Sequence, residues 1–214
     1  LYDPVFIRPD DSGTQESPTV IRSDPGEDAV LSGGVPIRNW KRQGKLWVAD
    51  VPMFNGRPLD FRQLWVDGRK ATRARDVEDC ERMHRICSVD EKTETLYVPA
   101  AAVRQITDGR GALKSRYAEM VLHQMWCVAN LRIRSVQVLG DSAAVRFHQP
   151  ESRIQFEHPW PHPMVTTDGH NSAFYLTNAR ELLDVPGEWY HDIDTRKLYY
   201  YPREGEDMQS AEAV

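Results

Sequence analysis

The chain is dominated by short alternating apolar and polar segments that proline, glycine and aspartate interrupt. The clearest example lies near the end of the chain, where Pro186 and Gly187 make a turn and Trp189 begins a strand. Turn residues follow at 192–195, and the aromatic run at 198–201 forms the return strand. Because the alternation has a period of two rather than 3.6, this segment predicts a β-hairpin and the chain is predicted to be mainly β.

Turn residues elsewhere in the chain also predict β structure. Asp67 and Gly68 stand between two alternating runs and tolerate the positive φ that a type I′ hairpin turn requires. Helix is expected only over residues 100–106, after Pro99, and in a single turn at 179–183.

The spacing of the strands divides the chain into two architectures. Residues 1–38 carry short strands at a coil-like spacing, which is typical of stacked parallel rungs that need neighbours to bury their faces. Residues 39–204 carry longer alternating strands joined by tight turns, which favours an antiparallel β-sandwich or barrel-like domain. Residues 205–214 are expected to be a return strand that leads out of this domain.

A series of landmarks resembles a known family in both content and order. In chain order the landmarks are Asp11-Ser-Gly-Thr14, Leu31-Ser-Gly-Gly34, the segments 46–52 and 61–75, His123-Gln-Met-Trp126 and Pro186-Gly-Glu-Trp-Tyr190. Together they resemble secreted right-handed parallel β-helix proteins, notably those of glycoside hydrolase family 141, which act on plant polysaccharides. Residues 76–115 lie outside the resemblance.

The resemblance gives each part of the chain an expected role. It implies that residues 1–38 are the first coils of a right-handed parallel β-helix, that residues 39–204 are a β-domain inserted into it, and that residues 205–214 lead to further coils. Because family members are longer, we expect this sequence to be a fragment. The remaining β-helix portion, or a second chain, is then its expected protein partner. Secretion or a periplasmic location is implied by the family.

Composition excludes several other classes of function. The formal net charge is −5, and no basic run is available to neutralise phosphates, so a nucleic-acid partner is not expected. No stretch approaches the roughly 18 apolar residues that a membrane span needs. No glycine-rich phosphate loop and no nucleophile motif is present, and we expect no cofactor.

A metal site is also not expected. Cys80, His84 and Cys87 have a suggestive spacing, but a structural zinc site needs a fourth ligand and none lies nearby. A disulfide between Cys80 and Cys87 stays open as an alternative. His158 and His162 lie in a stiff proline-rich loop that opposes convergence of their side chains.

The sequence offers no credible catalytic pair of carboxylates. Asp192 and Asp194 lie in a hairpin turn, where aspartate usually bonds the local backbone, and Glu188 has a similar structural interpretation. The resemblance implies that the catalytic acids belong to later coils, so no catalytic residue is named.

His123 and Trp126 are candidates for binding a sugar. An indole face stacks on the C–H patches of a sugar ring, and imidazole hydrogen-bonds hydroxyl groups. Three residues apart on one strand, they are expected to point to opposite faces, so that one enters the core. The alternatives are a core tryptophan and a structural histidine.

Three further residues complete the candidate set. Trp160 lies between prolines in an extended loop, which presents it at a rim or packs it as part of a rigid connector. Arg75 and Arg116 offer donors to sugar hydroxyls or to an acidic pectic sugar, although exposed arginine is mostly a solubilising residue.

Two functions therefore compete. The first is a non-catalytic wall of the substrate cleft in a secreted glycoside hydrolase that acts on plant cell-wall polysaccharide, such as xylan or pectin-type side chains. The alternative is a carbohydrate-binding or purely structural module of a β-helix surface protein without catalysis. Carboxylates on inward-facing positions of the further coils would distinguish the two.

Overall fold

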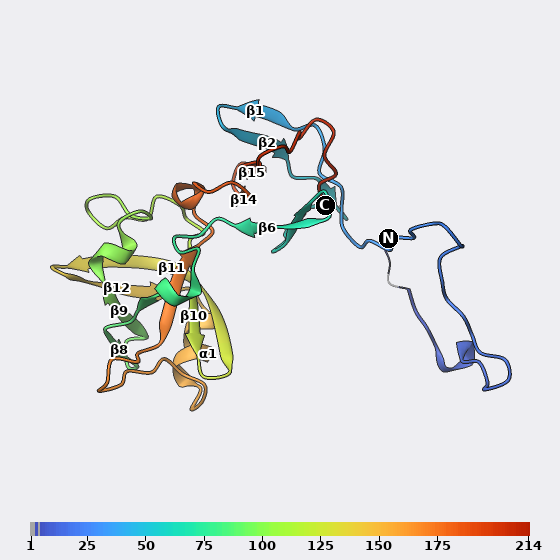
Figure 1. Cartoon of the computed structure of the whole chain (residues 1–214). Helices are drawn as coiled ribbons and strands as arrows, with labels where there is room; N and C mark the ends of the chain where they lie inside the picture. Colours follow the sequence, from blue (N-terminus) through green and yellow to red (C-terminus); the bar gives the residue numbers. More distant parts are fainter. Residues whose placement is uncertain (1–2, 4) are drawn as a thin grey trace.

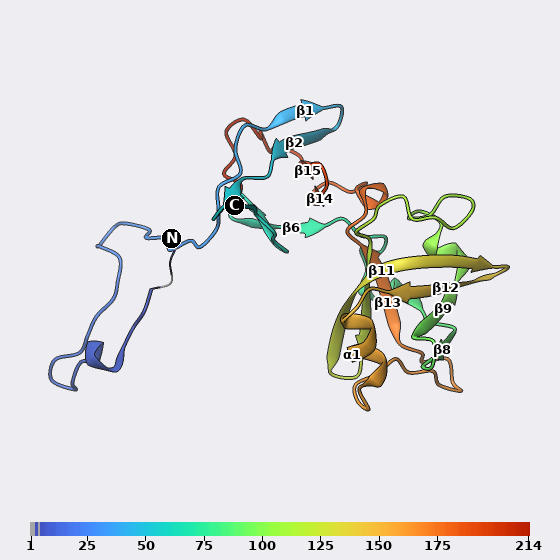
Figure 2. The ribbon, with the colours of Figure 1, turned by 180° about the vertical axis from the view of Figure 1, so that it is seen from behind.

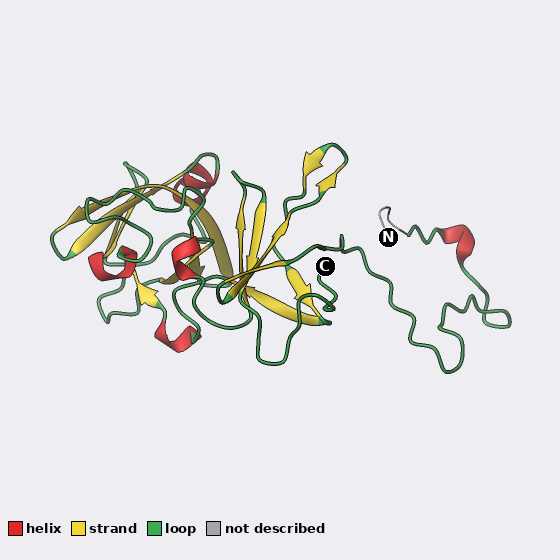
Figure 3. Cartoon of the chain, turned by 90° about the horizontal axis from the view of Figure 1, so that it is seen from above, coloured by secondary structure: helices red, strands yellow, loops and turns green. Residues whose placement is uncertain are grey.

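The computed structural model describes residue 3 and residues 5–214. Most of the strands belong to two sheets, and residues 5–29 extend away from both of them (Figures 1 and 3). A short hairpin of β3 (Met53–Phe54) and β4 (Arg57–Pro58) accompanies the sheets. The predicted mainly β class is confirmed.

The first sheet has six strands in the order β1-β2-β15-β14-β6-β5. Its strands are β1 (Lys41–Gln43), β2 (Leu46–Asp50), β5 (Leu64–Val66), β6 (Arg69–Arg73), β14 (Glu188–Asp192) and β15 (Lys197–Tyr200). Both predicted hairpins are present, because β14 pairs antiparallel with β15 and β5 pairs antiparallel with β6. Asp67 and Gly68 between β5 and β6 have φ angles of 47° and 70°. The pair β6 and β14 runs parallel, which differs from the all-antiparallel domain expected here.

The second sheet has seven strands in the order β7-β13-β10-β11-β12-β9-β8, and it curls around the larger hydrophobic core (Figure 2). Its strands are β7 (His84–Arg85), β8 (Ser88–Asp90), β9 (Thr95–Pro99), β10 (Glu119–Gln124), β11 (Cys127–Leu139), β12 (Ser142–Phe147) and β13 (Ala173–Thr177). Met120, Leu122, Phe174 and Leu176 point inward and are fully buried. Alternate residues therefore face away from the core, which leaves a second face for polar side chains.

Helix is scarce, and its longest piece was not predicted. The helical elements are η1 (Pro9–Asp11), η2 (Cys80–Arg82), η3 (Ala100–Val103), α1 (Glu151–Glu157) and η4 (Arg180–Leu182). The turn expected at 179–183 is confirmed as η4, and η3 covers the first part of the helix expected at 100–106. The expectation of no other helix beyond single turns is wrong at α1, which the Arg153–Glu157 ion pair and the packing of Phe156 on Phe147 support. Within the described residues, no helix has the length and apolar content to cross a membrane.

Residues 5–36 lie outside both sheets. The short strands expected in this part of the chain are not formed, and the segment exposes large apolar side chains: Val5, Phe6, Ile7, Val20, Ile21, Val30 and Leu31. A rung of stacked strands forms only when neighbouring rungs supply hydrogen-bond partners and apolar cover. The parallel coils expected for residues 1–38 therefore stay a prediction.

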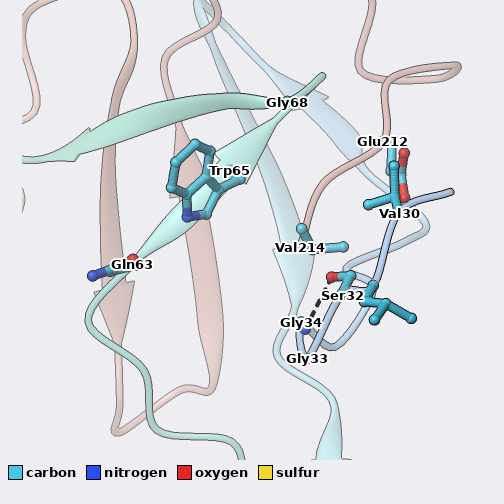
Figure 4. A pocket seen from close by; sticks show the side chains of 10 residues that line it. Val30, Ser32, Gly33, Gly34, Gln63, Trp65, Gly68, Glu212 and Val214 are labelled. Carbon is cyan, nitrogen blue, oxygen red and sulfur yellow. Dashed lines mark hydrogen bonds between the residues drawn. The ribbon is translucent and has the colours of Figure 1, made fainter. Parts of the chain in front are cut away.

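The end of the chain is integrated into the six-stranded sheet. The Trp65 N–H donates to the Val214 carbonyl at 2.8 Å, and the Val214 N–H donates back to the Trp65 carbonyl at 3.0 Å. The preceding residue, Ala213, is also paired: its carbonyl accepts from the Ile37 N–H at 2.8 Å, and Ala213 is buried. Beside this junction, residues 30–34, Trp65 and Val214 enclose an open hollow of about 490 Å³ (Figure 4). The final residues are thus paired rather than left as an open edge.

His191 on β14 is buried in the smaller core. Its ring stacks on Phe61 with centroids 5.3 Å apart, and its Nε2 atom has no hydrogen-bond partner among the described residues. Burial lowers the pKa of His191 below its ordinary value, with the Arg73 charge acting in the same direction and Asp60 opposing it. The folded protein therefore holds this imidazole neutral under conditions in which an exposed histidine takes up a proton.

A neutral buried histidine makes stability depend on pH. Because the pKa is lower in the folded than in the unfolded state, this contribution is fully present above the unfolded pKa, falls as the pH drops below it, and is lost as the pH falls through the folded pKa. Replacing His191 by phenylalanine keeps the stack on Phe61 and removes the titration. The free energy of unfolding of His191→Phe relative to the wild type should therefore increase from about pH 8 to about pH 5, measured by urea denaturation. A constant difference over this range would contradict the buried neutral imidazole.

Candidate functional site

The side of β10 that points away from the larger core carries Glu119, Val121 and His123. Its cross-strand neighbours are Thr177, Tyr175 and Ala173 on β13, and Arg132, Asn130 and Val128 on β11. These residues of the three strands are called the outer face below. Its carboxylate, amide, hydroxyl and imidazole groups offer hydrogen bonds along the length of β10.

Glu119 is the buried charge of the outer face, with only 4% of the residue exposed. Its two carboxylate oxygens accept from the Arg62 guanidinium, at 2.6 Å and 3.3 Å, and the same carboxylate accepts from Arg73 Nη1 at 3.0 Å. Arg62 precedes β5 and Arg73 ends β6, so both arginines come from the six-stranded sheet. The ion pairs therefore join the two sheets at one end of the outer face.

Tyr175 organises the middle of the outer face. The Arg75 guanidinium lies 5.8 Å from the Tyr175 ring centroid, and the His123 ring lies 5.9 Å from it. Arg75 also pairs with Glu78 at 3.3 Å. Two of the five residues predicted from the sequence, His123 and Arg75, therefore meet through a tyrosine that the sequence did not single out.

A groove of about 380 Å³ opens where β6 approaches the outer face. It is lined by Arg62, Lys70, Ala71, Thr72, Arg73, Arg75, Val121, Asn130, Tyr175 and Thr177. Hydrogen-bond donors dominate this lining. Such a surface suits a ligand that is rich in acceptor oxygens.

Trp126 lies beyond His123, in the turn between β10 and β11, and the interpretation of a core tryptophan in a strand is wrong. It is 86% exposed, and it packs edge to face on Trp160, which is 47% exposed, with centroids 5.3 Å apart. Strand β10 ends at Gln124, so the strand geometry that would turn one of His123 and Trp126 into the core does not apply. Trp126 has a φ of 62°, a left-handed conformation that is unfavourable for a bulky side chain.

Arg116 lies apart from these residues. Its guanidinium is 3.7 Å from the Asp194 carboxylate and packs over the Tyr117 ring at 5.3 Å. Within the described part of the chain it makes no hydrogen bond, ion pair or ring contact with the other four candidates. The structure therefore gives Arg116 a place on a different surface from the outer face.

The residues weighed as metal ligands have other partners. The Trp160 N–H donates to His158 Nδ1 at 3.3 Å, and His162 Nδ1 lies 3.0 Å from the Pro159 carbonyl oxygen. His84 Nε2 is 3.0 Å from an Asp76 carboxylate oxygen. Cys87 carries an exposed free thiol rather than a disulfide, and the side chain of Cys80 lies outside the described residues.

The carboxylates of the β14–β15 hairpin serve the backbone. Asp192 accepts from the Thr195 N–H at 3.1 Å. Glu188 accepts from the N–H groups of Arg75, Asp184 and Val185 at 3.0–3.1 Å. These bonds favour the ionised form, but burial outweighs them and raises the pKa of Glu188 to about 7.

Comparison with known proteins identifies the family of this chain. A sequence profile of the GH141 insertion domain matches residues 44–203. The chain belongs to glycoside hydrolase family 141. A solved structure titled "Glycoside hydrolase" is 79% identical, has a TM-score of 0.93, and is matched over 100% of this chain and 36% of its own length. A search of curated proteins gave no match.

The matched region holds the parts of the site that sequence patterns did not reveal. Residues 44–203 of this family 141 chain contain Arg62, Glu119 and Tyr175. Glu119 had a readable signal, because a single carboxylate inside the apolar strand run 118–122 needs a charged partner when it is buried. The identity of that partner had no local signal, since Arg62 and Glu119 are 57 positions apart.

The variants Trp126→Gly and Trp126→Ala together measure the backbone strain at position 126. Both changes remove the contact with Trp160, but only glycine relieves the positive φ. Trp126→Gly should therefore be about 1 kcal/mol more stable to unfolding than Trp126→Ala, measured by urea denaturation. Met125 serves as the control because its φ is not positive. There the Met125→Gly variant should be less stable to unfolding than Met125→Ala. An alanine variant at 126 that matches the glycine variant would show that the turn is unstrained.

Proposed function

We propose that this insertion domain forms one wall of the substrate cleft in a secreted or periplasmic glycoside hydrolase that acts on plant cell-wall polysaccharide, of xylan type or with pectin-type side chains. The observation that carries the proposal is the exposed pair Trp126 and Trp160 next to the outer face. The domain contacts the polysaccharide and leaves the bond-breaking step to residues outside this chain.

The tryptophan pair has the properties of a sugar-binding platform. Two indoles that are 86% and 47% exposed forgo the burial that usually stabilises this side chain. Their edge-to-face contact holds both rings in place, so little side-chain freedom remains to be lost when a sugar ring stacks on them. A strained φ at Trp126 is tolerated at a position where a glycine would fit without strain, which supports a functional reason for the indole.

His123 supports binding along the same line. It lies between the tryptophan pair and the groove, and its ring contacts Tyr175 at 5.9 Å. A polysaccharide that stacks on Trp126 can therefore continue along β10, where His123, Tyr175 and Asn130 offer hydrogen bonds to its hydroxyl groups.

Carboxylates of the domain already accept hydrogen bonds from other groups of the protein, which supports a non-catalytic role. Glu119 is held by two arginines, Glu188 is surrounded by backbone donors, and Asp194 accepts from the Tyr117 hydroxyl at 3.0 Å. Glycoside hydrolysis needs two carboxyl groups that flank the scissile bond, one of them able to donate a proton. These three groups lie in separate hydrogen-bond networks, so we assign the reaction to acids contributed by other coils.

Residues 1–38 are proposed to complete a parallel β-helix with further polypeptide, and residues 205–214 to lead towards it. The exposed apolar side chains of residues 5–36 support this, since a long run of them in water is unfavourable and rungs need neighbours. The partner is the remaining β-helix portion of the same protein or a second chain.

Substitution of the tryptophans should weaken turnover without unfolding the protein. In the complete hydrolase, Trp126→Ala and Trp160→Ala should each lower kcat/KM on a cell-wall oligosaccharide about 3- to 10-fold, mainly through KM, as stacking contacts are lost. His123→Ala should act in the same direction. Thermal melts separate this effect from lost stability.

Leu139→Ala is the matched control, because Leu139 is 44% exposed at the opposite end of β11. It should leave both KM and the melting temperature unchanged. If the tryptophan variants keep full activity and melt normally, the cleft-wall function is wrong and the domain is a structural insert.

Removal of the covering polypeptide should expose the apolar segment. The isolated 214-residue chain should associate or bind a hydrophobic dye through residues 5–36, and deletion of residues 1–35 should abolish this while preserving the two sheets. Light scattering and circular dichroism measure the two effects. A monodisperse isolated chain that binds no dye would argue against further coils packing on this segment.

A further inference from the structure

We infer that the groove beside Glu119 binds the carboxylate of an acidic sugar, a uronate unit of the polysaccharide that the outer face contacts. This assignment rests on the proposed function and specifies the chemistry of its substrate. It is carried by the charges that line the groove.

The lining of the groove is cationic. Arg62, Lys70, Arg73 and Arg75 contribute four positive charges, and none of the described residues that line the groove is acidic. Glu119 lies beneath this surface and is almost completely buried. A ligand in the groove therefore meets guanidinium and ammonium groups rather than the carboxylate that anchors two of them.

Part of this positive charge has no counterpart in the fold. Arg62 and Arg73 share Glu119, and Arg75 pairs with Glu78. The Lys70 ammonium forms no ion pair or hydrogen bond with the described residues, and the buried Nε of Arg73 also has no partner there. A ligand carboxylate in the groove would supply the counter-charge that Lys70 lacks.

The arginines are also pre-organised. The two bonds from Arg62 to Glu119 and the third from Arg73 fix both guanidinium groups before any ligand arrives. Charge-assisted bonds from fixed donors to a carboxylate are stronger than neutral bonds, and less side-chain entropy is lost on binding. This arrangement selects for an anionic oxygen over a neutral hydroxyl.

Neutral groups in the groove suit the sugar ring that bears the carboxylate. Asn130, Thr72 and Tyr175 line the same space and hydrogen-bond hydroxyl groups. Val121 at the groove lies three residues before Gln124, the end of β10, roughly 10 Å in an extended strand, and Trp126 lies in the turn that follows. One oligosaccharide can thus place an acidic unit in the groove while a neighbouring unit stacks on the tryptophan pair.

The test compares two forms of one ligand on the full-length protein. Calorimetry measures the Kd of a galacturonic acid trisaccharide and of its methyl ester, which keeps the rings and removes the charge. The acid should bind about tenfold more tightly than the ester, and added NaCl should reduce this preference. Equal affinity of the acid and the ester would overturn the inference.

Matched lysine variants locate the effect. Lys70→Gln should weaken binding of the acid about tenfold and leave the ester unaffected, because Lys70 has no partner in the fold to lose. Lys92→Gln makes the same charge change in the turn between β8 and β9 and should leave both affinities unchanged. An equal loss from both variants would show a general effect of net charge, and the inference would fall.

Two further outcomes separate this inference from the proposed function. If the acid and the ester bind equally and Trp126→Ala weakens both, the cleft wall stands and the acidic specificity is wrong. If neither trisaccharide binds but Trp126→Ala still lowers turnover of a cell-wall oligosaccharide, the cleft wall stands and the uronate assignment is wrong; if Trp126→Ala also keeps full activity, both are wrong. Inorganic phosphate that binds as tightly as the acid would identify a simple anion site and would also overturn the assignment to a sugar.

Discussion

The buried carboxylate of Glu119 is the interaction on which the arrangement of the two sheets depends. Taking an ion out of water costs several kcal/mol unless close partners compensate it. Here both ion-pair partners come from the side of the neighbouring sheet, Arg62 before β5 and Arg73 at the end of β6. The seven-stranded sheet can therefore bury this strand residue only while the six-stranded sheet lies against it. The same contact fixes two cations beside the groove, so the stability of the junction and the chemistry of the surface have one origin.

Local signals predicted the local parts of the fold. The hairpins at Asp67 and at residues 192–195 follow from turn residues whose effect is confined to a few positions. Helix α1 was missed because it is only seven residues long and shows no clear apolar stripe, although Glu151 in its first turn is a weak start signal. The parallel pairing of β6 with β14 had no local signal, since the paired residues Thr72 and Glu188 are far apart in sequence.

The candidate site shows the same division between local and distant information. His123, Arg75, Trp126 and Trp160 were found by residue type; in the structure Trp126 contacts Trp160, and His123 and Arg75 each contact Tyr175. The strand was predicted to continue through Trp126, because nothing in the local pattern marks a turn at a bulky aromatic residue. Arg116 was selected in the same way, as a hydrogen-bond donor, and lies on another surface, beside Asp194. Residue type identifies capable side chains, whereas their grouping depends on strand pairing over long sequence distances.

The contact between Ile37 and Ala213 has a consequence for how such a domain is acquired and exchanged. Because the backbone enters the two-sheet body at one of these residues and leaves it at the other, and the two are hydrogen-bonded neighbours, the whole body occupies the space of a single loop in any protein that hosts it. A short linker that joins residue 36 to residue 214 would remove both sheets together. Exchanging the segment between these two positions would therefore replace both sheets, with the groove and the tryptophan pair, as a single unit.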